Sequence, residues 1–171
     1  MPNWCNNSIT IRGSKDKIKS LWDAANVTED KGLLNALHPE PTYDTDGEWY
    51  GWRTANWGTK WEVGKEGLEF VDEGEGAAIT GWFDSAWSPP VDALRFYCEQ
   101  NPDVMIDATY FEPGLCFVGR WLHLPEEGVD DQFYEYGGHS SDNVRDHIGE
   151  YLDDQWNISE ELAQYEEEEN G

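Results

Sequence analysis

The chain has 171 residues with 36 acidic and 11 basic side chains, which give a formal net charge of −25 at pH 7. Its 10 tryptophans, 8 tyrosines and 6 phenylalanines can bury enough apolar surface for a core, so disorder throughout is not expected. The negative charge repels a phosphate backbone, so direct nucleic-acid binding is not expected either.

Cysteine usage and hydropathy predict a cytoplasmic protein. The three cysteines are an odd number without a Cys-x-x-Cys motif, which is typical of reduced thiols in a cytosolic setting. The sequence shows no basic segment followed by an apolar signal-peptide core, and no run of about 18 apolar residues. We therefore expect neither secretion nor a membrane-spanning segment.

The first predicted elements are a strand and a helix. Residues 5–12 alternate with period two and include β-branched side chains, which predicts a strand. Ser14 can then cap a helix of about 12 residues. The side chains expected to face the core are Cys5, Asn7, Ile9 and Ile11 on the strand and Ile18, Leu21, Trp22 and Ala25 on the helix.

Residues 27–66 form a long segment without regular periodicity, interrupted by prolines and glycines. Such long loops are uncommon in compact domains. Its aromatic side chains could hardly remain solvated, so we expect an ordered insertion after the first helix. Its densest part is residues 52–61, which bring together three indoles, one guanidinium and one ammonium group.

Regular periodicity returns after the insertion. Ser88 is expected to cap the second helix, with Pro89 in its first turn. The resulting order of strand, helix, insertion, two strands, helix and two strands predicts an α+β domain. The expected strands are residues 68–71, 77–83, 104–111 and 115–124, and the expected helix is residues 90–99.

The charge is concentrated near the carboxyl end of the sequence. Residues 125–171 carry 16 acidic side chains and one basic side chain, Arg145, a net charge of −15. We therefore divide the chain into a domain of residues 1–124 and an acidic helical extension of residues 125–171 that docks on it.

The extension is expected to be helical because its apolar side chains recur at helical spacing. Ser140 or Ser141 can cap the first helix, Ser159 begins a short last helix, and residues 166–171 are predicted to be a frayed tail. The apolar stripe consists of Val144, Ile148, Tyr151, Leu152 and Trp156.

Four sequence blocks, rich in aromatic side chains and turn residues, follow one another along the domain. They are Met1-Pro2-Asn3-Trp4-Cys5-Asn6-Asn7, Trp52-Arg53 with Asn56-Trp57-Gly58-Thr59-Lys60-Trp61, Phe83-Asp84-Ser85-Ala86-Trp87-Ser88-Pro89-Pro90, and Tyr110-Phe111-Glu112-Pro113-Gly114 with Phe117-Val118-Gly119. Together these blocks resemble the YubB-type proteins of phages and plasmids, and the resemblance covers residues 1 to about 124. It implies a ferredoxin-like β-α-β-β-α-β core with two helices on one face, and a gene from a phage or another mobile element. The family has no established activity, so no catalytic residue follows from the resemblance.

The ring-rich insertion has two interpretations. In the first it is a solid cap over one end of the sheet, with Arg53 or Lys60 paired with Asp84 or stacked on an indole. In the second its polar groups surround an aromatic-lined pocket for a small anionic or nucleotide-like ligand. The candidate pocket residues are Arg53, Asn56, Trp57, Lys60, Trp61, Asp84 and Trp87.

The acidic extension suggests a different function. Carboxylates spread along a rigid surface can imitate the phosphates of a duplex and occupy the basic groove of a nucleic-acid-binding protein. The simpler interpretation of such a surface is solubility. For a phage protein, the expected partner is a basic host defence protein. The candidate partner-binding residues are Asp142, Asp146, Glu150, Asp153, Asp154, Glu160 and Glu161.

Other chemistries lack their motifs. The RNP1 pattern of RNA-recognition domains and the Gly-x-Ser-x-Gly nucleophile elbow are both absent. The histidines are spread along the chain, and His139 and His147 are expected to lie too far apart for one metal ion. We therefore expect no metal, no cofactor and no enzymatic activity, and the pattern predicts no particular oligomeric state.

Overall fold

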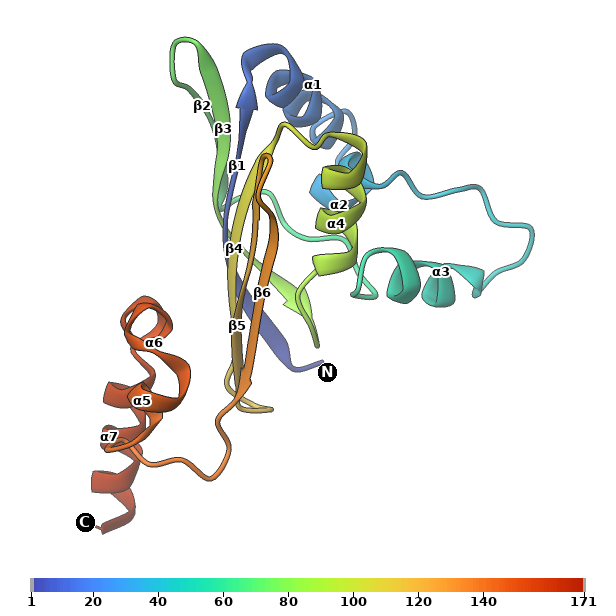
Figure 1. Cartoon of the computed structure of the whole chain (residues 1–171). Coiled ribbons are helices and arrows are strands. Elements are labelled where there is room, and N and C mark those ends of the chain that lie inside the picture. The colour runs from blue at the N-terminus through green and yellow to red at the C-terminus, as the bar shows by residue number, and fades with distance from the viewer. Residues whose placement is uncertain (1, 171) are drawn as a thin grey trace.

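The protein is described by a computed structural model of residues 2–170, and it is an α+β protein built on a six-stranded antiparallel sheet (Figure 1). The order across the sheet is β2-β3-β1-β4-β5-β6. The strands are β1 Trp4–Ser14, β2 Leu68–Asp72, β3 Gly76–Ala86, β4 Met105–Glu112, β5 Phe117–Leu124 and β6 Gly128–Glu135. The helices are α1 Lys15–Ala25, α2 Leu33–Leu37, α3 Glu48–Asn56, α4 Val91–Gln100, α5 Val144–Ile148, α6 Glu150–Trp156 and α7 Ile158–Asn170.

The central strand β1 pairs with β3 on one side and β4 on the other. Its predicted inward face, with Cys5, Asn7, Ile9 and Ile11, is buried as expected. The Ser14 hydroxyl caps α1 by accepting a hydrogen bond from the Lys17 amide at 3.3 Å, which confirms the predicted helix start. Helices α1, α2 and α4 cover this face of the sheet (Figure 1) and enclose the main core.

The start of α4 differs from the prediction. The helix begins at Val91, after Pro90, and no side chain caps it. The Ser88 hydroxyl instead donates to the carbonyl oxygen of Gly58. Ser88 therefore ties the end of β3 to the insertion, and the prediction that it caps the helix is wrong.

The insertion is ordered, as its aromatic content predicts, and contains α2 and α3. The Glu62 carboxylate caps α2 by accepting hydrogen bonds from the amides of Gly32, Leu34 and Asn35 at 2.8 to 3.1 Å. Backbone donors at a helix start need such a partner because they have none within the helix. One carboxylate at the end of the insertion therefore fixes its beginning.

Strand β6 was not expected, because its region was assigned to the helical extension. It pairs with β5 along its whole length, for example Asp131 opposite Trp121. Most of its side chains are exposed, so the sequence shows no alternation between apolar and polar positions. Asp130 and Asp131 place charge on this outer strand, which discourages pairing with another sheet edge.

Helices α5, α6 and α7 pack on the face of the sheet opposite α1 and α4, near one end (Figure 1). Two short helices replace the single predicted one, because Gly149, with φ +92°, separates α5 from α6. Asn157, in the left-handed conformation at φ 53°, then separates α6 from α7. The shared apolar cluster contains Phe111, Val118, Tyr136, Val144, Ile148, Leu152 and Ile158.

The last helix is longer than predicted. Helix α7 continues to Asn170, so the expectation of a frayed tail is wrong for residues 166–170, while Gly171 lies outside the described residues. Glu166 contributes to this order, because its carboxylate accepts from the Ser141 amide at 3.0 Å and hydroxyl at 2.6 Å. None of the helices described within residues 2–170 has the length and apolar character needed to cross a membrane.

Candidate functional site

Arg53 is held within the protein. Its Nε and Nη2 donate to the Glu40 carboxylate at 2.6 and 2.9 Å, and its guanidinium carbon lies 5.2 and 4.9 Å from the ring centroids of Trp49 and Trp57. Burial alone raises the pKa of Glu40, but hydrogen bonds from Arg53 and Tyr43 outweigh it and hold that pKa below its usual value. The cation expected to bind a ligand is therefore already paired.

Two more of the candidate pocket residues have internal partners. Trp57 is 1% exposed, and its Nε1 donates to the carbonyl oxygen of His38 at 2.9 Å. The Asn56 amide donates to the carbonyl oxygen of Trp52 at 2.8 Å, one turn earlier in α3. These contacts are those of a packed cap, the first of the two interpretations of the insertion.

The remaining pocket candidates lie at the surface. Lys60 Nζ is 4.3 Å from the ring centroid of Trp61, which in turn lies 6.0 Å from the ring of Trp4. Trp87 and Asp84 are exposed at the end of β3. Within residues 2–170, neither Arg53 nor Lys60 forms an ion pair with Asp84.

The acidic candidates are distributed over α5, α6, α7 and the turn that precedes them. Six of the seven are exposed, and the exception is Asp153, whose side chain is 2% exposed. Its carboxylate accepts from the amide and hydroxyl of Ser159, both at 2.7 Å, and from Arg145 at 2.9 Å. Asp153 thus joins α5, α6 and α7 and cannot face a partner. The six exposed residues are Asp142, Asp146, Glu150, Asp154, Glu160 and Glu161.

Arg145 neutralises part of this surface. Besides Asp153, it contacts Asp154 at 2.7 Å and Glu150 at 4.0 Å. Burial raises the pKa of Asp153, but the hydrogen bonds from Ser159 and Arg145 outweigh that effect and hold the pKa below its usual value. The carboxylates of this cluster that have no cationic partner lie mainly along α7 and the start of α5.

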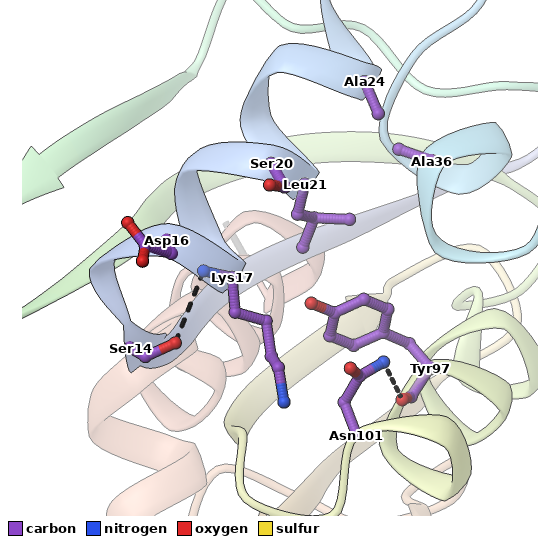
Figure 2. A pocket seen from close by; sticks show the side chains of 9 residues that line it. All are labelled: Ser14, Asp16, Lys17, Ser20, Leu21, Ala24, Ala36, Tyr97 and Asn101. Atoms are coloured by element: carbon purple, nitrogen blue, oxygen red, sulfur yellow. Dashed lines mark hydrogen bonds between the residues drawn. The ribbon is translucent and has the colours of Figure 1, made fainter.

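A cavity with a volume of about 520 Å³ lies between α1, α2 and α4 (Figure 2). It contains none of the predicted site residues. Its one cation, Lys17, is 2.6 Å from Asp103. The Tyr97 ring closes one side, and burial raises the pKa of its hydroxyl to about 12. Within residues 2–170, the only charged side chain that lines this open groove without an ion-pair partner is Asp16.

A smaller cavity of about 330 Å³ lies on the other face of the sheet, between β1, β3 and α6. Trp82, which is 60% exposed, lines one side of the cavity, and Trp156 of α6 lines another side. The sequence pattern predicts Trp156 in an apolar stripe, and Trp82 is not among the predicted site residues. The available signal was that Trp82 precedes the buried Phe83 on a strand, so its side chain must point to the opposite face.

The histidines differ from the expectation in one respect. The rings of His139 and His147 stack at a centroid distance of 4.1 Å, so they are not far apart in space. His147 Nε2 is already 2.9 Å from the Glu135 carbonyl oxygen. Across residues 2–170, no group of three or more histidine, cysteine, aspartate or glutamate side chains could hold a metal ion.

Comparison of the chain with known protein families, with curated proteins and with solved structures finds no match. The function must therefore be argued from the residues and their arrangement.

Proposed function

We propose that this protein is a non-enzymatic binding protein whose acidic helices occupy the basic surface of a nucleic-acid-binding protein. The observation that carries the proposal is the exposure of six carboxylates on α5–α7 and the turn before them, in a region with a net charge of −15. Such a surface presents to a basic groove the same sign of charge as a phosphate backbone.

The helices that carry the charge are fixed to the sheet. Ile148, Leu152 and Ile158 are buried at 3% exposure or less against Phe111 and Val118. Burying each of these side chains contributes about 1.5 to 3 kcal/mol, which offsets the mutual repulsion of the carboxylates. A solubilising tail needs no such packing, whereas a mimic needs its charges in fixed positions.

The surface also favours rapid association with a cation-rich partner. An excess of negative charge on these helices raises the rate of encounter with a positively charged surface, and salt reduces this effect. Partial neutralisation by Arg145 leaves α7, with Glu160 and Glu161, as the most strongly acidic element. We therefore place the centre of the interface on α7.

The setting of the function is part of the proposal. The order β2-β3-β1-β4, with α1 and α4 on one face, supports a ferredoxin-like core that β5 and β6 enlarge. The motif blocks shared with YubB-type proteins support an origin in a phage or another mobile element. A host defence nuclease or its DNA-binding component, in the bacterial cytoplasm, is then the expected target.

The alternative is a protein that binds a small anionic or nucleotide-like ligand through the ring-rich insertion. Arg53, its best cation, is paired with Glu40, and Trp57 is buried. The other cation among the candidate pocket residues, Lys60, lies near the surface and stacks on Trp61. The geometry therefore favours the acidic surface over this pocket.

The test is capture of partners from a bacterial lysate with immobilised protein. The test variant carries Asp142→Lys, Asp146→Lys, Glu160→Lys and Glu161→Lys. The matched control carries Glu29→Lys, Asp30→Lys, Asp44→Lys and Asp46→Lys, which make the same charge change at exposed residues of the insertion. We expect the wild type and the control to capture the partner and the test variant to fail. The partner should also be lost at about 0.5 M salt, because salt then screens the attraction between opposite charges within a few ångströms. Equal capture by both variants would refute the proposal.

A further inference from the structure

The cavity of about 330 Å³ between the sheet and α6 has a floor built from two neighbouring strands, β1 and β3. On β1, Asn6 lies opposite Asp84 of β3 and Phe111 of β4, and Ser8 lies opposite Trp82. Alternation along β1 places Asn6 and Ser8 on the face opposite the buried core. The cavity is therefore part of the sheet surface that α1 and α4 leave uncovered.

Four of the polar side chains that line this cavity have no partners within the part of the chain that the structure describes, whereas the amide of Asn7 donates to Cys5, Phe83 and Ser85. Among residues 2–170, the side chains of Asn6, Ser8, Asp84 and Gln155 form no hydrogen bond or ion pair with one another or with their neighbours. Trp156 Nε1 is buried without a hydrogen-bond partner.

Elsewhere on the same sheet face, several polar side chains are paired with each other. Arg120 and Asp107 form a two-pronged pair at 2.9 and 2.8 Å, and the hydroxyls of Thr10 and Thr80 lie 3.3 Å apart. These groups are already paired, whereas Asn6 and Ser8 are half-buried and Asp84 and Gln155 are exposed at the cavity. The polar groups of the cavity are therefore accessible to a group from outside.

Two indoles give the cavity its shape. Trp82 lies against Gly67, where an added Cβ would come within 2.5 Å of the ring, so this glycine allows the indole to rest on the backbone. Trp156 stacks on Phe111 at a centroid distance of 5.6 Å, which fixes its orientation. An exposed flat ring beside an unpaired carboxylate is the combination that recognises a planar cation.

We propose that this cavity receives an arginine side chain of the basic partner, an inference that rests on the proposed function. The guanidinium stacks on Trp82 and donates to the Asp84 carboxylate, and its remaining N–H groups face the amide oxygens of Asn6 and Gln155. A planar guanidinium fits these acceptors better than the compact ammonium of lysine.

The probe is N-acetyl-arginine amide, with N-acetyl-citrulline amide as an uncharged ligand of the same shape. Binding is followed by the indole N–H signals in NMR spectra, assigned with Trp→Phe variants. We expect saturable shifts of the Trp82 and Trp156 signals with arginine, and affinity about tenfold weaker for citrulline because it lacks the charge. Equal affinities for the two ligands, or shifts confined to other tryptophans, would overturn the proposal.

Variants identify the residues that bind. Asp84→Asn and Trp82→Ala are each expected to weaken arginine binding about tenfold, since each removes a charge-assisted or cation–ring contact. The matched controls are Asp46→Asn and Trp87→Ala, an exposed acid and an exposed indole that do not line the cavity. Unchanged urea midpoints show that all four variants fold. Equal weakening by the controls would count against the cavity.

The same variants separate this inference from the proposed function. If arginine amide does not bind and Asp84→Asn captures the partner as the wild type does, the cavity proposal fails while the acidic helices keep their role. If arginine amide binds but the helix variant with four lysines still captures the partner, the proposed function fails and the cavity remains a guanidinium site.

Discussion

Arg53 and Glu40 form a two-pronged ion pair in which the Arg53 Nε and Nη2 atoms lie within 2.9 Å of the carboxylate oxygens. The side chains are 23% and 13% exposed, so the pair is partly desolvated. We expect Arg53→Ala to lower the free energy of unfolding by about 2 kcal/mol, because it leaves Glu40 without its cation. Arg53→Lys should recover only part of the loss, since lysine cannot form the fork.

Urea unfolding followed by tryptophan fluorescence measures this effect. Lys60→Ala is the matched control, because Lys60 belongs to the same insertion but only stacks on Trp61 and should contribute less than about 1 kcal/mol. Equal losses in the two variants would show that the Arg53–Glu40 pair does not hold the insertion.

Asp153 and Asp154 are consecutive carboxylates with different roles. Asp153 is buried and bonded to Ser159 and Arg145, whereas Asp154 is 70% exposed. We expect Asp153→Ala to destabilise the protein by about 3 kcal/mol, because it removes the cap at the start of α7 and takes one buried carboxylate partner away from Arg145. Asp154→Ala should cost less than about 1 kcal/mol. Thermal unfolding of the two variants compares them, and a reversed order would contradict the assigned roles.

The depressed pKa of Asp153 predicts how stability depends on pH. Its ionised form is favoured in the folded protein, so its contribution is present above the usual pKa of 3.8 and disappears as pH falls through the lower folded value. We expect the difference in unfolding free energy between the wild type and Asp153→Asn to shrink as pH falls below the usual pKa of 3.8. A difference that stays constant from pH 7 to about 2 would contradict this linkage.

The thiols should react in a defined order. Burial raises the pKa of both Cys5 and Cys98 to about 12, whereas Cys116 lies in the turn before β5 and is only half-buried. The folded protein should therefore show one fast-reacting thiol with a disulfide reagent at pH 8, and Cys116→Ser should remove it. Rapid reaction of two thiols in the native protein would show that the sheet or α4 opens.

Local patterns in the sequence predict the first strand and the first helix well. The alternation of residues 5–12 gives β1, and Ser14 gives the start of α1, because both signals come from neighbours along the chain. Strand β6 could not be predicted in this way, since Asp130 and Asp131 make it polar on both faces and only its pairing with β5 makes it a strand.

The sequence predicts that the candidate site is acidic, but it does not predict which of the carboxylates are exposed. Acidic residues after position 125 are evident from the sequence, yet nothing local indicates that Asp153 turns inward while Asp154 faces solvent. The difference arises from the turn at Asn157, which brings Ser159 back to Asp153. Strand alternation indicates that Trp82 faces away from Phe83, but nothing local indicates that this sheet face is left uncovered or that the insertion buries Trp57.

The most direct test of the account is competition between this protein and duplex DNA for the captured partner. Because the acidic helices are proposed to occupy the partner's nucleic-acid-binding surface, duplex DNA should release the partner in a concentration-dependent way, with the apparent affinity falling as salt rises. A stable complex that contains the protein, the partner and DNA together would contradict the central claim.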